Sequence, residues 1–294
     1  MIAFLTTSTK GRAIAAIMSR GATVTTSSTI IEKNPFLEQE GTPKFSKLKP
    51  ENLGPAVDSL LGEMERNFAD FEQSLSSKAV KYDDVLPEVE KIQAPLEYAW
   101  GVAGHLKGVN DSEELRTVYQ KSQPDVVKSF TKFSQSKELY DALIKIQDSW
   151  KEVEDVDGEL LSFEEQQKRR AVENALRSMR LGGVALEGTQ KERFNDIKLR
   201  LAEISTKFSN NVLDATKAFS LTIEDADTMK DVPESACAMW AQAHEKYIND
   251  KSDGEYQEVD LKTGPWRVTL DGPSYINAMQ FLPDRNLRET IYRA

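Results

Sequence analysis

The fold is decided by the stretch from Thr189 to Phe219, which reads TQKERFNDIKLRLAEISTKFSNNVLDATKAF. Its apolar residues recur at steps of three and four, which places them on one face of about eight turns of α-helix. The opposite face is charged. The stretch therefore predicts one long helix that lies on a core with its apolar stripe. The stripe consists of Phe194, Ile197, Leu201, Ile204, Phe208, Val212, Ala215 and Phe219, and the charged face of Lys191, Glu192, Asp196, Lys198, Arg200, Glu203 and Lys207.

Shorter helices are predicted around this stretch, because a helix of roughly 45 Å at 1.5 Å per residue needs neighbours along its length. The same apolar spacing runs from Leu53 to Leu75. Pro95 is expected to kink or divide the next helix, and Pro124 is expected to start a new one. The predicted helices cover residues 50–75, 83–106, 111–121, 124–134, 137–150, 162–181, 233–247, 274 onward and 286–294.

Local signals mark several helix ends. Asp111 with Glu114, and Ser162 with Glu165, have the spacing of a capping box. The glycine pair that begins at Gly182 predicts a helix stop. Together with the apolar spacing, these signals predict a mostly α-helical fold.

A small β-hairpin is predicted near residues 256–270. Residues 256–261 and 266–270 have the composition of two short strands around a turn at 262–265. The last helical segment carries no capping residue, so we expect the supplied chain to end inside a helix.

Composition limits the classes of partner. The formal net charge of -10 argues against nucleic acid and anionic membranes, and no apolar run approaches the roughly 20 residues of a membrane span. At 294 residues the chain is long enough for one large or two ordinary domains. The single cysteine, Cys237, excludes an internal disulfide and fits a reducing compartment.

The first 33 residues differ in composition from the rest. Up to Ile31 there is no acidic residue, whereas Lys10, Arg12 and Arg20 are basic and serine and threonine are frequent. This composition is typical of an organellar transit peptide, and the alternative is a disordered tail. Composition does not distinguish a plastid from a mitochondrial signal.

The two histidines do not form a recognisable metal motif. His244 and Glu245 begin like the zinc helix H-E-x-x-H, but position 248 is isoleucine, so the second imidazole is missing. We expect His244 to be a solvent-facing helical residue. His105 is expected at a helix end or core edge, because no serine or cysteine nucleophile motif accompanies it.

Other candidate sites have simpler structural interpretations. Asp155, Asp157 and Glu164 imitate part of a calcium loop, but valine stands at the first ligand position, which favours a solvated acidic turn. Cys237 has no basic neighbour that would lower its pKa, so it is expected to pack inertly. The glycines at 101, 104 and 108 lack the spacing of a phosphate loop, and the pairs at 113–114 and 164–165 suit helix starts. We therefore predict no catalytic and no metal-binding residue in this chain.

Several short runs together resemble the oligopeptidase A branch of the thimet oligopeptidase family of zinc metallopeptidases. The most specific is FSNNVLDAT, from Phe208 to Thr216. The others, in family order, are Asn34-Pro35, Lys49-Pro-Glu51, Trp100 with His105-Leu106, Ser112 to Arg116, Ser162 to Gln167, Val172 to Leu176, Leu181 to Leu186, Arg193-Phe194, Leu270 to Tyr275, Asn286 to Arg288 and Tyr292 to Ala294.

The resemblance implies an α-helical, two-lobed shell around a deep channel that admits short peptides. It also implies a zinc ion held by H-E-x-x-H and a downstream glutamate, with the motif glutamate as general base. None of those residues is present here. The matching region is the N-terminal helical lobe, so we expect this chain to hold no cofactor and to be inactive by itself, with zinc in a full-length relative.

Two functions are therefore expected as alternatives. In the first, the chain is the N-terminal portion of a zinc-dependent oligopeptidase that turns over short peptides in a mitochondrion or plastid, or alternatively in the cytoplasm. Its partners are short peptides and the missing C-terminal catalytic region, which should dock on exposed apolar surface. In the second, it is a non-catalytic helical peptide- or protein-binding protein.

We divide the chain into residues 1–33, a helical lobe at 34–222 and the start of a further region at 223–294.

Overall fold

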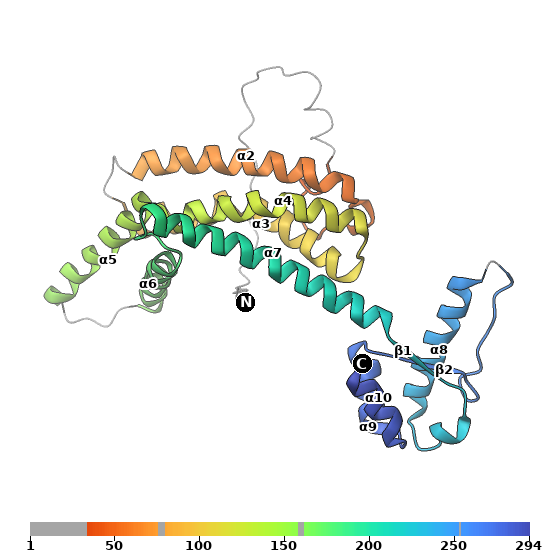
Figure 1. Cartoon of the computed structure of the whole chain (residues 1–294). Coiled ribbons are helices and arrows are strands. Elements are labelled where there is room, and N and C mark those ends of the chain that lie inside the picture. The colour runs from red at the N-terminus through yellow and green to blue at the C-terminus, as the bar shows by residue number, and fades with distance from the viewer. Residues whose placement is uncertain (1–33, 76–79, 158–161, 253) are drawn as a thin grey trace.

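The computed structural model describes residues 34–75, 80–157, 162–252 and 254–294 (Figure 1). It confirms a mostly α-helical fold with a small sheet. The chain forms two hydrophobic cores that the long helix α7 (Gly188–Ala218) connects. This helix runs along the first core and projects beyond it toward the second (Figure 1). The predicted transit segment, residues 1–33, lies outside the described residues.

The first core is a stack of helices that lie side by side (Figure 1). The apolar stripe of α2 is buried along its whole length and packs against α3 and α4. The Phe68 ring stacks on Phe133 of α4 with 3.7 Å between ring centroids. The elements are η1 (Phe45–Lys47), α2 (Pro50–Leu75), α3 (Tyr82–Val109), α4 (Glu113–Ser134), α5 (Lys137–Asp157) and α6 (Phe163–Leu181).

The predicted start of a new helix at Pro124 is wrong, and so is a division of the helix at Pro95, whereas the alternative of a kink at Pro95 stays a prediction. Helix α4 continues through Pro124, and α3 continues through Pro95. A proline inside a helix costs about 3 kcal/mol, because it removes one backbone hydrogen bond and crowds the preceding turn. Burial of Leu115 and Val126 on either side of Pro124 offsets that cost, since each buried aliphatic side chain contributes about 1.5–3 kcal/mol.

The start of α4 also differs from the prediction. Its N-cap is Ser112, whose Oγ accepts a hydrogen bond from the Leu115 amide at 3.2 Å. Asp111 does not cap the helix with Glu114; its carboxylate instead accepts two hydrogen bonds from Arg116, both 2.7 Å. A charged guanidinium fork competes successfully for this carboxylate because it binds both oxygens at once.

The signals at both ends of α6 are confirmed. The Ser162 hydroxyl accepts from the Glu165 amide at 3.3 Å, and the Glu165 carboxylate accepts from the Ser162 amide at 2.9 Å. Gly182 caps the C-terminus, and Gly183 follows with φ of 88°, a left-handed conformation that glycine adopts without strain.

Helix α7 exists where it was predicted, but the prediction of its packing face is wrong. It lies on α4 through small polar residues, of which Thr206 and Asn210 are buried. Gln123 of α4 donates to the Thr206 hydroxyl at 2.8 Å. Five residues of the apolar stripe are exposed: Ile197 by 42 %, Leu201 by 57 %, Ile204 by 47 %, Phe208 by 67 % and Val212 by 49 %. We call these five residues the α7 stripe.

The second core follows α7 and contains the sheet. Trp240 and Trp266 are its largest fully buried side chains, and the Trp240 indole donates to the Ser274 hydroxyl at 2.9 Å. The strands pair antiparallel, with Leu221 opposite Val268. The elements are β1 (Ser220–Ile223), η2 (Ala226–Met229), α8 (Glu234–Lys251), β2 (Trp266–Thr269), α9 (Gly272–Phe281) and α10 (Arg285–Arg293).

The predicted strand at 266–270 is present as β2, but the predicted strand at 256–261 is wrong. The partner of β2 is β1, which lies far earlier in the chain. Side chains of α8 hold the 256–259 segment instead: Asn249 bonds both the amide and the carbonyl of Gln257, each at 2.8 Å, and Glu245 accepts from the Val259 amide at 3.0 Å. Because these backbone groups are bound to side chains, they are not available for hydrogen bonds to a neighbouring β-strand.

Within the described ranges, no helix combines the length and the apolar composition needed to cross a bilayer.

Candidate functional site

The two histidines lie in different cores and do not form a site together. His105 is exposed in the last turn of α3, where its ring lies 5.5 Å from that of Phe45, as expected for a helix-end residue. His244 lies on α8 and is half-buried rather than solvent-facing, and its enclosed Nδ1 has no hydrogen-bond partner among the described residues. The nearest aromatic ring is that of Tyr247, with 6.4 Å between the ring centroids.

Metal chemistry finds no support in the described part of the chain. Among these residues, no three His, Cys, Asp or Glu side chains are grouped so that they could hold an ion. A zinc site of the kind implied by the family resemblance therefore does not fit the residues described. The side chains of Asp155 and Asp157, which imitate a calcium loop in sequence, lie outside the described side chains.

The remaining chemical candidates have structural roles. Cys237 is half-buried, and burial raises the pKa of its thiol, as expected for inert packing. Glu164 pairs with Lys168 at 3.0 Å on the surface of α6.

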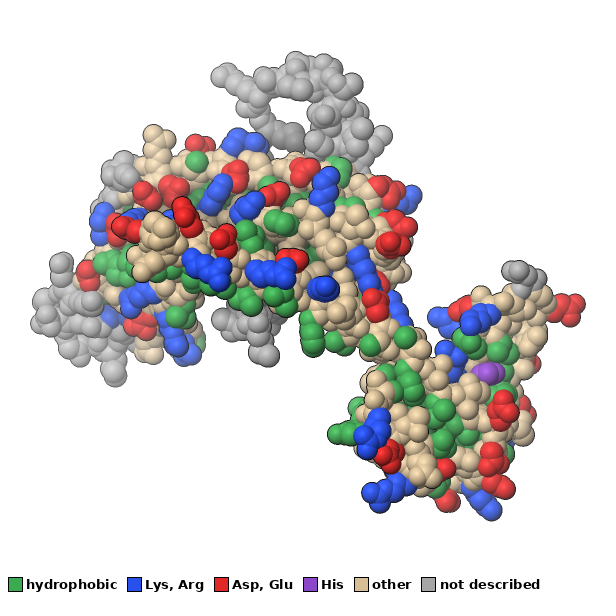
Figure 2. Space-filling view, in the orientation of Figure 1, with side chains coloured by type: hydrophobic (Ala, Val, Ile, Leu, Met, Phe, Trp, Pro, Cys, Tyr) green, Lys and Arg blue, Asp and Glu red, His purple; other side chains and the backbone are tan. Residues whose placement is uncertain are grey.

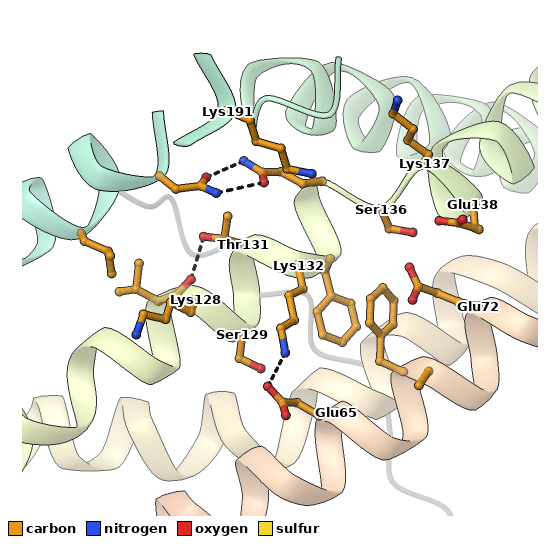
Figure 3. A pocket seen from close by; sticks show the side chains of 17 residues that line it. Glu65, Glu72, Lys128, Ser129, Thr131, Lys132, Ser136, Lys137, Glu138 and Lys191 are labelled. Atoms are coloured by element: carbon orange, nitrogen blue, oxygen red, sulfur yellow. Dashed lines mark hydrogen bonds and ion pairs between the residues drawn. The ribbon is translucent and has the colours of Figure 1, made fainter. Parts of the chain in front are cut away.

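A pocket of about 720 Å³ lies between α2, α4 and the first turns of α7 (Figure 3). Lys132 pairs with Glu65 across it at 2.5 Å, and Lys137 pairs with Glu187 at 2.5 Å. The Ser129 hydroxyl is buried and has no hydrogen-bond partner in the described part of the chain, but no histidine is among the lining residues to activate it. The pocket therefore lacks the elements of a nucleophilic site.

A larger groove, of about 980 Å³, lies between α3, α4 and α7. The ring of Trp100 stacks on that of Tyr119, with 4.0 Å between centroids. Burial raises the pKa of the Tyr119 hydroxyl to about 12. We call it the Lys107 groove; its lining includes Trp100, Gly104 and Lys107 of α3, Tyr119 and Gln123 of α4, and Phe208, Asn210, Val212 and Leu213 of α7.

Lys107 is the charged group of this groove. Its ammonium donates to Asn210 Oδ1 at 3.1 Å and lies 4.8 Å from the centre of the Tyr119 ring. Burial lowers the pKa of Lys107, with Arg116 as a further cause. Within the described residues it forms no ion pair, because the nearby Asp111 carboxylate is held by Arg116 and Lys217. The groove therefore presents a half-buried cation that has no ion pair among the described residues, although the Asp111 carboxylate acts on it at longer range.

The α7 stripe lies beside this groove and shares Phe208 and Val212 with it. Figure 2 shows hydrophobic side chains reaching the surface along the line of α7. Monomeric proteins rarely leave a continuous apolar surface of this kind uncovered, so the stripe is a candidate for a packing surface.

Sequence reasoning did not single out Lys107, Asn210 or Tyr119. A lysine on a helix normally indicates a solvated face, and its burial depends on where α7 crosses α3. The one signal that was present is that FSNNVLDAT, the run most specific to the family resemblance, supplies much of the α7 side of the groove.

Comparison with known proteins shows what this chain is similar to. Residues 57–191 match the neurolysin/thimet oligopeptidase N-terminal domain. Over these residues the chain is similar to the thimet oligopeptidase family. Its relatives within the family are oligopeptidases A, so the resemblance seen in the short sequence runs is confirmed.

Three relatives illustrate the match. The chain is 35 % identical to the probable cytosolic oligopeptidase A of Arabidopsis thaliana, over 90 % of this chain and 35 % of that protein. It is 34 % identical to the organellar oligopeptidase A, chloroplastic/mitochondrial, of the same plant, over 90 % of this chain and 31 % of that protein. It is 29 % identical to oligopeptidase A of Escherichia coli, over 89 % and 35 % respectively. The chain thus spans about a third of the length of the curated relatives it matches.

Proposed function

We propose that this chain forms the N-terminal helical lobe of an oligopeptidase that hydrolyses short peptides. The relatives are oligopeptidases by name, and the family match lies in their N-terminal domain. We keep the proposed division into a helical lobe at 34–222 and a following region at 223–294; Phe219 and Leu221, at the end of the lobe, pack against the second core.

The α7 stripe is the observation that carries this proposal. In our account, the rest of the enzyme packs on these five side chains. Their exposed fractions of 42–67 % in the described chain leave apolar area that such packing would remove from water. The charged residues of α7, among them Arg200 and Glu203, lie outside the stripe and remain free for solvent.

The peptide-cleaving chemistry belongs, in this proposal, to the remainder of the enzyme. The described residues offer no metal-binding group, so a zinc ion would be held by residues that this chain does not supply. We therefore expect the 294-residue chain to show no peptidase activity by itself.

We further propose an organellar location, mitochondrion or plastid, with the cytoplasm as the alternative. The support is the acid-free, serine- and threonine-rich composition of residues 1–33 and the organellar relative in Arabidopsis. The cytosolic relative has comparable identity, so location is tested separately by fusing residues 1–33 to a fluorescent protein.

The experiment that tests the proposed function is capture of the endogenous protein with an antibody against this chain, followed by intact mass, zinc content and hydrolysis of a quenched fluorogenic peptide. The expected species is roughly three times as long as this chain, in proportion to the coverage of its relatives, carries zinc and loses activity when a chelator removes it. A zinc-free species of 33.1 kDa or slightly less, with no activity, would favour the non-catalytic binding protein instead.

A further inference from the structure

The Lys107 groove combines two chemical features that rarely occur together on a free surface. One is an ammonium group that is half-buried and has no anionic partner among the described residues. The other is an apolar wall formed by Trp100, Val212 and Leu213. A partly desolvated charge gains more from a matching anion than a solvated one, because less water has to be displaced and the local dielectric is lower.

The hydrogen-bonding capacity at the groove floor is also incomplete. Lys107 has three N–H donors, and one of them is used on Asn210 Oδ1. The Asn210 amide NH₂ makes no hydrogen bond to another described residue and is not enclosed, although the residue as a whole is only 8 % exposed. Two adjacent groups, one charged and one neutral, therefore present unused donors at the same place.

We propose that the Lys107 groove binds the free C-terminal carboxylate of a short peptide, with the apolar side chain of its last residue against Trp100 and Leu213. The carboxylate oxygens would accept from Lys107 and from the Asn210 amide. This inference rests on the proposed function, and it assigns a recognition role to the N-terminal lobe itself.

Charge complementarity and spacing favour this ligand over an internal acidic residue. A C-terminal residue carries its carboxylate and its side chain on the same Cα, so a single residue meets the cation and the apolar wall together. An internal aspartate or glutamate uses its side chain for the charge and has no apolar group left on that residue. A neutral peptide end leaves the Lys107 ammonium unpaired, as it is in the free groove.

Calorimetric titration of the 294-residue chain tests the proposal with three blocked peptides. They are N-acetyl-Ala-Ala-Ala-Leu with a free carboxylate, the same peptide as its C-terminal amide, and N-acetyl-Ala-Ala-Glu-Ala amide. The free acid is expected to bind about tenfold or more tightly than either amide, the factor that one charge-assisted hydrogen bond supplies. Equal affinity for the three peptides, stronger binding of the glutamate peptide, or no binding of the acid at millimolar concentration would overturn the proposal.

Variants make the assignment residue-specific. Lys107→Gln should reduce affinity for the free acid to that of the amide, whereas Lys107→Arg, which keeps the charge, should retain the preference. Lys121→Gln is the matched control, because Lys121 is an exposed lysine of α4 that does not line the groove. Circular dichroism verifies that each variant is folded. If Lys107→Gln is folded and still prefers the acid, the proposal fails.

This outcome is separable from that of the proposed function. The groove is tested by binding to this chain, and the oligopeptidase proposal by the mass, zinc content and activity of the endogenous protein. If the endogenous protein is a zinc peptidase but its N-terminal lobe does not bind peptide carboxylates, only the role of the Lys107 groove is contradicted.

Discussion

Helix α2 buries the whole of its apolar stripe, whereas α7 turns a stripe of the same spacing to solvent. Leu53, Val57 and Phe68 of α2 are at most 4 % exposed. On α7, Leu201 and Phe208 are 57 % and 67 % exposed. The two helices are comparable in length, with 26 and 31 residues, so length does not explain the difference. Apolar periodicity indicates that a helix face is to be buried against another surface. It does not identify the segment that packs on that face.

The contacts that hold α7 to the first core differ in kind from those of α2. Small polar side chains of α7 make hydrogen bonds there in place of aliphatic packing: Thr206 accepts from Gln123 of α4, and Asn210 accepts from Lys107 of α3. A helix attached in this way can leave its apolar face available for a second surface. The following changes test that distinction, beginning with the largest expected effect.

Truncation on the two stripes should have very different costs. Leu53→Ala removes a fully buried side chain from α2 and should lower the free energy of unfolding by about 2–5 kcal/mol. Leu201→Ala on α7 should change it by less than about 0.5 kcal/mol, because the side chain is already in contact with water. Urea unfolding followed by circular dichroism measures both. Similar losses in the two variants would show that the α7 stripe is packed in solution.

Removing one polar contact between α4 and α7 should have an intermediate effect. Thr206→Val keeps the shape of the side chain but deletes the acceptor of the Gln123 hydrogen bond, and should cost about 1 kcal/mol. Thr189→Val, at an exposed position in the first turn of the same helix, serves as control and should lie within about 0.5 kcal/mol of the parent. An unchanged stability in Thr206→Val would mean that the polar interface does not hold α7.

The C-terminal end of α7 should respond to acid. Hydrogen bonds from Arg116 to Asp214 and Asp111 hold the pKa of both carboxyl groups below the ordinary value of about 3.9. Because these folded-state pKa values are lowered, the network stabilises the fold above about pH 4, and this contribution is lost as the pH falls through the folded-state values.

Arg116→Gln should therefore be less stable than the parent at neutral pH, and the difference should shrink as the pH is lowered below about 4. Urea midpoints measured across this range test the expectation. A difference that stays constant with pH would indicate lost packing of the Arg116 side chain in place of lost ion pairing.

The smallest effect on stability is expected for charges placed on the stripe. Leu201→Lys combined with Phe208→Lys should leave the unfolding free energy within about 1 kcal/mol of the parent, because both positions are exposed. The same pair should reduce self-association of the isolated chain, since it interrupts the apolar surface. Sedimentation velocity measures the association. Unchanged self-association would show that the chain associates through a surface other than the α7 stripe.

The helices were predictable because their signals are local. The α7 stretch, the capping box of Ser162 and Glu165 and the glycine stop at Gly182 all act within a few residues. Strand β2 was predictable for the same reason, but its partner was not. Pairing of Leu221 with Val268 depends on how the chain returns after α8, which no local pattern records.

The candidate site was less predictable than the fold. Lys107 and Asn210 are 103 positions apart in the chain and meet only because α7 crosses α3. The packing face of α7 was mispredicted because burial of Thr206 is stabilised by a hydrogen bond from Gln123, whereas the periodicity argument considers only apolar side chains. The absence of a complete H-E-x-x-H motif, in contrast, is visible in the sequence, because its two histidines, His105 and His244, are not four residues apart.

The most direct test of the account is hydroxyl-radical footprinting of the α7 stripe in two samples, the isolated 294-residue chain and the endogenous protein captured by antibody. Phe163 at the start of α6 is the internal control, because it is 76 % exposed and lies off the stripe. The account predicts strong modification of Leu201 and Phe208 in the isolated chain and clear protection in the endogenous protein, with Phe163 unchanged. Equal modification of both stripe residues in the two samples would contradict it.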